Sequence, residues 1–218
     1  MVYYGDPSTR SVSLNEMIRH GKSVRSGVSK AIMVVDMPYG TYKNPLSAKK
    51  NALRIIKETK CDAVKLEGGK EIIHIIKHLI KNKINVMGHI GLLPQKVRSK
   101  KDYRIKGKTL SEKNQIINDL KRIQESGVFA IVLEAVKYQT AKEVMKYAKI
   151  PIIGIGASNE CDGQILVLED MLGMFKKVPK FVKKYSNLRG YIKKAVKQYS
   201  KDISCLLYTS PSPRDVRS

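Results

Sequence analysis

Three short apolar runs in this sequence each end in an acidic side chain. The runs are Val34–Asp36, Val64–Glu67 and Val132–Glu134, and helix-like stretches separate them. This alternation predicts parallel strands, and the C-terminal ends of such strands carry the chemistry in α/β barrels and in open α/β sheets. We therefore expect the three carboxylates around one shared mouth.

Asp36 and Glu67 are expected to end successive strands, which would bring two hard oxygen ligands together. Such a pair suits Mg²⁺, because this ion keeps several waters and leaves room for a chelating substrate. The alternative is structural, with Asp36 capping the following turn and Glu67 pairing with a lysine. The spacing alone does not separate these two interpretations.

Lys65 lies two residues before Glu67, so both side chains point to the same face of an ideal strand. An ammonium group that faces the interior is unfavourable unless it is paired or binds an anion. Lys65 is therefore expected to form either a salt bridge inside the barrel or a contact with a substrate carboxylate. The following Gly68 and Gly69 permit a close approach of the backbone.

Glu134 and His89 complete the candidate set. Glu134 follows a strongly apolar run, where desolvation raises the pKa of a carboxyl group and suits it to general-base catalysis. The alternative role for Glu134 is an N-cap of the next helix. His89 is the histidine expected at the end of a strand, either in a site or in the core.

Composition bounds the class of protein. Of 218 residues, 42 are lysine or arginine and 19 are acidic, which gives a formal charge of +23. Lysine is spread along the expected helices without alternating aromatic residues, which favours solvated helix faces over a nucleic-acid surface. No apolar stretch approaches the roughly 18 to 20 residues that span a bilayer. The three cysteines are scattered, so we expect a cytoplasmic protein without a nucleic-acid or membrane partner.

Hydrophobic periodicity predicts the elements that position these residues. Strands are expected over Ala31–Val35, Cys61–Leu66, Ile84–His89, Val128–Leu133, Ile150–Ile155 and Ile165–Leu168. Helices are expected over Pro45–Glu58, Glu71–Ile80, Leu110–Ser126, Ala141–Ala148 and Phe181–Tyr199, with loop-like sequence before the first strand. The strands are apolar on both faces, as in a parallel sheet covered by helices.

Repeated strand–helix units indicate an α/β fold with right-handed crossovers. About six strands fall short of the eight in a (β/α)8 TIM barrel, which predicts an open sheet or an incomplete barrel. We expect one catalytic domain over residues 1–203. Residues 204–218 lose the helical pattern and become rich in Ser, Pro and Arg, so we expect a non-native or disordered tail there.

Seven segments, in this order, resemble the ketopantoate hydroxymethyltransferase (3-methyl-2-oxobutanoate hydroxymethyltransferase) family. They are VVDMP at Val34–Pro38, DAVKLEGG at Asp62–Gly69, VMGHIGLLPQ at Val86–Gln95, YRIKGKT at Tyr103–Thr109, VLEAV at Val132–Val136, IPIIGIGA at Ile150–Ala157 and DGQILVLEDMLGMF at Asp162–Phe175. The resemblance covers about residues 2–201, and VKLEGG together with GHIGL-PQ is highly specific.

The resemblance implies a (β/α)8 barrel, a homodecamer and a place in pantothenate biosynthesis. The implied reaction moves a hydroxymethyl group from 5,10-methylenetetrahydrofolate to 3-methyl-2-oxobutanoate and gives 2-dehydropantoate. It also implies that Asp36 and Glu67 bind Mg²⁺ and that Asp36 and Lys65 contact the oxo acid. Glu134 would accept the proton, and His89 matches a family histidine in the substrate pocket.

One departure from the family concerns an Asp-Ser pair in a VGDSLGM-like segment, which supplies a further metal ligand. The chain shows no such segment, and Asp6 aligns with a later loop position. We therefore expect an N-terminally truncated barrel that lacks its first two strands. The alternatives are an inactive fragment, another Mg²⁺-dependent oxo-acid lyase or mutase on a similar barrel, and a basic nucleic-acid or subunit-binding protein.

Overall fold

A computed structural model describes residues 8–99 and 102–205, and it contains two compact units. Unit 1 extends to Ile165 and holds the sheet, and unit 2 begins at Leu166. The expected catalytic domain over 1–203 spans unit 1 and most of unit 2, so its boundary stays a prediction. The expectations for Asp6 and for residues 206–218 of the tail lie outside the described residues.

Unit 1 is built on one parallel sheet of six strands in sequential order, β1-β2-β3-β4-β5-β6. The strands are β1 (Val34–Asp36), β2 (Ala63–Glu67), β3 (Val86–Gly91), β4 (Ala130–Glu134), β5 (Ile152–Ile155) and β6 (Gly163–Gln164). Sequential parallel order is the arrangement of a (β/α)8 barrel, of which the described residues supply six strands. The expected α/β fold with an incomplete barrel is confirmed.

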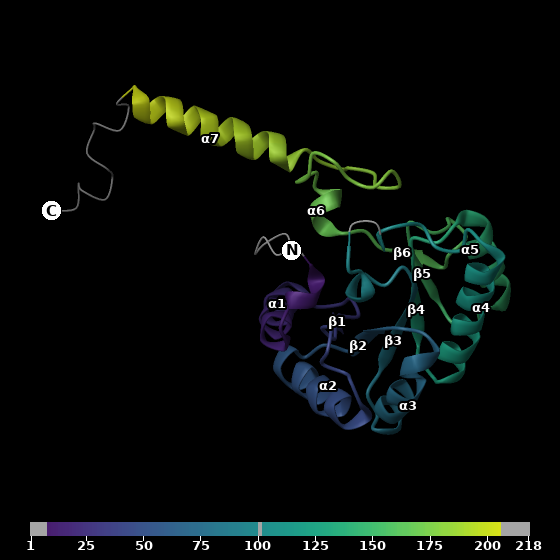
Figure 1. Cartoon of the computed structure of the whole chain (residues 1–218). Coiled ribbons are helices and arrows are strands. Elements are labelled where there is room, and N and C mark those ends of the chain that lie inside the picture. Colours follow the sequence, from purple (N-terminus) through teal and green to yellow (C-terminus); the bar gives the residue numbers. More distant parts are fainter. Residues whose placement is uncertain (1–7, 100–101, 206–218) are drawn as a thin grey trace. The chain divides into compact units, whose positions relative to one another are not determined.

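Helices lie along the outer side of this curved sheet, as Figure 1 shows for α1 to α5. In unit 1 they are α1 (Leu14–Gly27), α2 (Pro45–Thr59), α3 (Ile73–Lys81), α4 (Leu110–Glu125) and α5 (Tyr138–Tyr147). Short 3-10 helices span Thr9–Ser11, Lys70–Ile72 and Pro94–Lys96. Unit 2 contains α6 (Leu168–Met171) and α7 (Leu188–Ser204). No helix in the described part of the chain is long and apolar enough to cross a membrane.

Local signals explain where the longer helices begin and end. Ser13 and Glu16 form a capping box at the start of α1, and the Thr109 side chain accepts the N–H of Glu112 at the start of α4. Gly127 follows α4 with φ +95°, a backbone conformation that glycine adopts without strain. These contacts fix the lengths of the connections that return the chain to the next strand.

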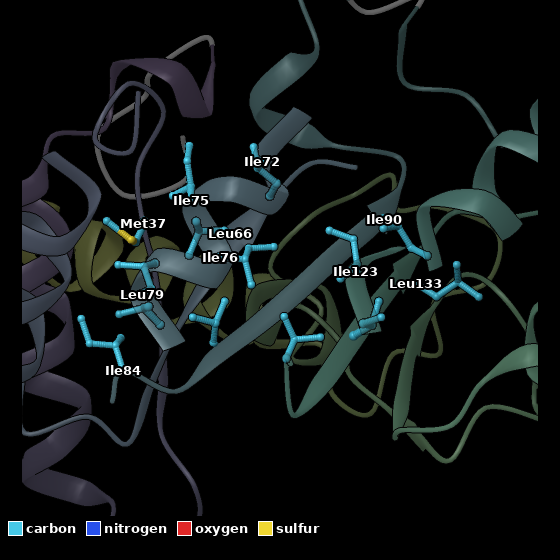
Figure 2. Close-up of a cluster of buried hydrophobic side chains, with 14 of the residues drawn as sticks. Met37, Leu66, Ile72, Ile75, Ile76, Leu79, Ile84, Ile90, Ile123 and Leu133 are labelled. Carbon is cyan, nitrogen blue, oxygen red and sulfur yellow. The ribbon is translucent and has the colours of Figure 1, made fainter. Parts of the chain in front are cut away.

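Side chains alternate between the two faces of the sheet. Leu66, Ile90 and Leu133 point toward the helices and join a fully buried apolar cluster with side chains of α3 and α4 (Figure 2). Successive residues of a strand face opposite sides of the sheet. The neighbours of these three residues along each strand therefore point to the inner, concave face. Glu67, His89 and Glu134 occupy those inner positions.

Three expectations about the elements are wrong. The last strand lies at Gly163–Gln164, and its pairing ends with the Ile165 N–H, which donates to the Gly154 carbonyl. The rest of the predicted run Ile165–Leu168 is not a strand, and α6 begins at Leu168. The expected loop before β1 contains the helix α1, whose short apolar face is interrupted by polar residues. The C-terminal helix begins at Leu188, seven residues after the expected Phe181.

Candidate active site

Strand register brings the predicted site residues to one edge of the sheet. Asp36 is the register partner of Lys65, and Glu67 is the register partner of His89. Gly91, two residues after His89, is paired with Glu134. The C-terminal ends of β1 to β4 therefore gather all five predicted residues.

The Lys65 ammonium group lies at the centre of this cluster. Its Nζ is 3.2 Å from Asp36 Oδ2 and 4.0 Å from Glu67 Oε1. Nζ also lies 3.0 Å from Nδ1 of His89. Only 13% of the Lys65 side chain is exposed, so water screens these contacts far less than it would on a surface. Lys65 therefore forms the expected salt bridge and also lies among the other predicted site residues.

His89 connects Lys65 to Glu134. Burial, reinforced by the Lys65 charge, lowers the pKa of His89 to about 3, so the imidazole is neutral. A neutral ring that accepts from Lys65 at Nδ1 carries its proton on Nε2. Nε2 lies 3.2 Å from Glu134 Oε2, but the N–H is not aligned with it, and Nε2 has no hydrogen bond among the described residues. Nε2 is thus a buried donor whose nearest carboxylate is that of Glu134.

Both glutamates of the cluster hold their protons more tightly than an exposed carboxyl group does. Burial raises the pKa of Glu67 to about 7, against the opposing effect of the Lys65 charge. Burial likewise raises the pKa of Glu134 to about 7. A group with this pKa exchanges protons readily near neutral pH, which general-base catalysis requires.

The backbone around Glu134 is held in an unusual conformation. The next residue, Ala135, has φ +47°, a left-handed conformation that side chains disfavour. Hydrogen bonds to Ile155 and from Lys106 maintain it, each at 2.8 Å. Opposite, Gly91 has φ +92°, and a Cβ there would lie 2.5 Å from the carbonyl oxygen of Glu134. The glycine therefore permits the close approach of β3 to the end of β4.

Gly69 serves a different contact from the one a ligand would make. A Cβ at Gly69 would lie 2.2 Å from Oδ1 of Asp119 on α4. That oxygen accepts a hydrogen bond from the backbone N–H of Lys70 at 3.1 Å. The close approach expected at Gly68-Gly69 thus involves a helix side chain of the same chain.

Strand-end reasoning missed two residues that contact Glu67. The backbone N–H of Gln95 donates to Glu67 Oε2 at 2.9 Å, and the Tyr42 hydroxyl oxygen lies 3.3 Å from the Glu67 carbonyl oxygen while its proton goes to Gln95 Oε1 at 2.8 Å. Tyr42 lies in the turn after β1 and Gln95 in the short 3-10 helix Pro94–Lys96 after β3, where hydrophobic periodicity gives no signal. The available signal was the position of Gln95 inside the GHIGLLPQ segment.

The donor chemistry of the site fits a hydrated Mg²⁺ ion. No group of three or more His, Cys, Asp or Glu side chains in residues 8–99 and 102–205 has a metal-binding arrangement. However, the carboxylates of Asp36 and Glu67 both face one positive charge, that of Lys65. Mg²⁺ is commonly held by one or two carboxylates and several waters, and the Asp36 side chain is 44% exposed to supply them.

Solved structures resemble the fold. The fold superposes on that of a phosphonopyruvate hydrolase with a TM-score of 0.53 and 11% sequence identity, covering 99% of this chain and 77% of that one. At this identity the likeness extends to the fold alone. It agrees with the barrel architecture inferred from the sheet.

Sequence relatives are much closer. A 3-methyl-2-oxobutanoate hydroxymethyltransferase of Pelagibacter ubique is 52% identical over 93% of this chain and 77% of its own length. The protein of the same name from Sulfurimonas denitrificans is 43% identical over 100% of this chain and 82% of its own length. The family model for ketopantoate hydroxymethyltransferase matches residues 1–210. The chain belongs to the ketopantoate hydroxymethyltransferase family.

Proposed function

We propose that this protein transfers a hydroxymethyl group from 5,10-methylenetetrahydrofolate to 3-methyl-2-oxobutanoate, giving 2-dehydropantoate for pantothenate biosynthesis. The observation that supports this most directly is the buried Lys65–His89–Glu134 arrangement beside two further carboxylates. It combines a cation for an acidic substrate with a carboxyl group of raised pKa. Membership in the family supports the choice of substrates.

Lys65 binds the carboxylate of the oxo acid. Its ammonium is nearly buried and lies beside the carboxylates of Asp36 and Glu67, so an incoming carboxylate replaces or joins them as its partner. A charge-assisted hydrogen bond in such a site is stronger than one between neutral groups. This contact fixes the orientation of the substrate relative to Glu134.

Asp36 and Glu67 would hold Mg²⁺, with Asp36 also touching the oxo acid. When bound, the ion polarises the 2-oxo group of the substrate and stabilises negative charge that develops there. The protein contributes two oxygen ligands from adjacent strands, whose spacing is fixed by the register of β1 and β2.

Glu134 removes the proton from C3 of the oxo acid. Its pKa near 7 leaves a substantial deprotonated fraction at neutral pH while keeping the carboxylate basic. His89, neutral and fixed by Lys65, holds its Nε2–H 3.2 Å from the Glu134 carboxylate. The resulting carbanion of the oxo acid bonds to the methylene carbon of the folate while one carbon–nitrogen bond of that methylene group breaks. Water then replaces the remaining folate nitrogen on this carbon, which gives the hydroxymethyl group of 2-dehydropantoate and releases tetrahydrofolate.

The assembly and location of the protein follow from its family as parts of the same proposal. We expect a cytoplasmic homo-oligomer, which is a decamer in this family. The residues that bind the folate are not assigned.

Two assays test the proposal. The first measures exchange of the C3 proton of 3-methyl-2-oxobutanoate in D2O by NMR, with Mg²⁺ and without folate. The second measures formation of 2-dehydropantoate by mass spectrometry after 5,10-methylenetetrahydrofolate is added. Exchange and folate-dependent product are both expected. Consumption of the oxo acid without folate would favour an oxo-acid lyase or mutase, and absence of both activities would contradict the proposal for this chain.

A further inference from the structure

Gln95 is a buried polar residue of the 3-10 helix Pro94–Lys96, within the loop that follows β3. Only 7% of it is exposed, and both polar atoms of its side chain are paired. Nε2 donates to the carbonyl of Met37 at 2.9 Å, and Oε1 accepts from the Tyr42 hydroxyl at 2.8 Å. Met37 and Tyr42 both follow β1. The side chain of Gln95 therefore joins the loop after β3 to the loop after β1.

The backbone of the same residue contacts the site. Its N–H donates to Glu67 Oε2 at 2.9 Å. The other polar neighbours of that carboxylate, Lys65 Nζ and His89 Nδ1, stand 4.0 and 3.9 Å from Oε1, too far for a hydrogen bond. Within the described residues, Gln95 thus supplies the hydrogen bond that orients the Glu67 carboxylate.

The two sets of contacts are linked through one short loop. The Gln95 amide sits in a buried place where water does not readily replace a lost partner, so breaking its bonds to Met37 and Tyr42 releases the loop. The backbone N–H then moves away from Glu67. From this geometry we propose that Gln95 is a positioning residue, which fixes the Glu67 carboxylate through its own anchored backbone.

The inference deepens the proposed function, because it rests on Glu67 as a ligand of Mg²⁺. Groups that hold metal ligands in place commonly change metal affinity by about 10- to 100-fold when they are removed. The Gln95 side chain hydrogen-bonds to Met37 and Tyr42, so it acts on Glu67 through the position of its own N–H. Its effect should therefore appear in binding before it appears in stability.

Gln124 offers a matched control on the far side of α4. Its Nε2 donates to the Tyr147 carbonyl at 3.1 Å, and its Oε1 accepts from the Lys149 N–H at 3.0 Å. It thus bridges two backbone groups much as Gln95 bridges its partners, but it contacts no predicted site residue. Gln124→Met removes the same chemical group as Gln95→Met.

The experiment measures Mn²⁺ affinity of the whole chain by EPR for wild type, Gln95→Met, Tyr42→Phe and Gln124→Met. Gln95→Met is expected to weaken Mn²⁺ binding about 10- to 100-fold, and Tyr42→Phe by a smaller factor in the same direction. Gln124→Met is expected to bind as the wild type does. Wild-type affinity in both Gln95→Met and Tyr42→Phe would overturn the inference. If Gln95→Met does not fold, Tyr42→Phe alone decides.

Crystal structures of metal-free wild type and Gln95→Met separate this inference from the proposed function. The inference requires the Glu67 carboxylate to leave the N–H of residue 95 in the variant. An unmoved carboxylate would overturn it. Failure of wild type to bind Mn²⁺ would instead remove the metal assignment of Asp36 and Glu67, and the crystal structures would still decide whether Gln95 positions Glu67.

Discussion

The two ends of the parallel sheet use acidic residues in opposite ways. At the N-terminal ends of the strands, Asp62 precedes β2 and Asp162 precedes β6. At the C-terminal ends, Glu67 closes β2 and Glu134 closes β4. All four lie within one residue of a strand, yet their oxygens meet different partners.

The aspartates at the N-terminal ends hold the backbone. Asp62 Oδ2 accepts the N–H of Met33, just before β1, and Asp162 Oδ2 accepts the N–H of Ile152, at the start of β5, each at 2.8 Å. In both cases an acid before one strand secures the start of the neighbouring strand. This repeated contact satisfies backbone donors that the sheet leaves unpaired.

At the C-terminal ends of β1, β2 and β3, backbone N–H groups that follow each strand pair with carbonyls of the neighbouring strand. The N–H groups of Met37, Gly68 and Leu92 donate to the carbonyls of Lys65, His89 and Glu134. The acidic side chains there face charged and titratable groups, and burial raises the pKa of both glutamates to about 7. The comparison teaches that the acids at the N-terminal ends bind the backbone of the neighbouring strand. At the C-terminal ends, Glu67 accepts a backbone N–H only from Gln95, outside the sheet, and both glutamates lie close to titratable side chains.

Glu134→Gln is the substitution that should affect activity most. It keeps the size of the side chain but removes the base, so turnover to 2-dehydropantoate should fall at least about a hundredfold. The free energy of unfolding should not decrease, because a neutral amide avoids the desolvation of a buried charge. Steady-state kinetics and urea denaturation measure the two effects. Near-normal turnover would remove Glu134 from its proposed role.

Lys65→Met tests the cation at the same end of the sheet. Loss of a charge-assisted hydrogen bond worth about 1.5–3 kcal/mol should raise the KM for 3-methyl-2-oxobutanoate roughly 10- to 100-fold. Lys22→Met is the control, because Lys22 pairs with Glu58 on the surface, where such pairs contribute little. Equal KM values for Lys65→Met and wild type would contradict the assignment of the substrate carboxylate.

The pH dependence of proton exchange should report the raised pKa of Glu134. A general base acts in its deprotonated form, so kcat/KM for C3 exchange should fall about tenfold per pH unit below a pKa of about 7. Asp162→Ala should show the same acidic limb, because Asp162 lies at the other end of the sheet. A profile that stays flat down to pH 5 would show that the base has an ordinary carboxyl pKa.

Asp62→Ala and Asp162→Ala should lower stability while leaving turnover nearly unchanged, the reverse of the effect expected for Glu134→Gln. Each leaves a buried or partly buried backbone N–H without its acceptor, which should lower the free energy of unfolding by about 1–3 kcal/mol. Turnover should stay within about twofold of wild type, since neither side chain reaches the site. Urea denaturation with parallel activity assays tests this, and a large loss of turnover without loss of stability would break the comparison.

Much of the sheet could be predicted from sequence because its strands are buried on both faces. Continuous apolar runs ending in Glu67 and Glu134 marked both the strands and the ends that carry the candidate site. The parallel order followed from the strand–helix alternation. The two-residue period of a strand already predicted that Lys65 and Glu67 point to the same face.

The position of the sixth strand and the role of Gln95 depend on contacts that a pattern of apolar residues does not predict. The sixth strand lies at Gly163–Gln164, where backbone pairing with Ile153 and Gly154 decides its place, and the apolar run at Ile165 that followed is half exposed. Gln95 was missed because its role depends on a loop conformation set by distant partners. The role of such a residue can be recognised only in the folded structure, where its partners from other parts of the chain lie beside it.

The alternation of apolar and charged residues along β2 also disfavours pairing of this strand in the wrong register. If β2 paired one residue out of register, its side chains would exchange faces, and Lys65 would enter the cluster that now holds Leu66, Ile76 and Leu79. An unpaired ammonium in that apolar layer costs several kcal/mol, a large part of a domain's stability. The charged residues proposed to perform the reaction therefore also disfavour a misregistered sheet, because the shifted strand would bury them without partners.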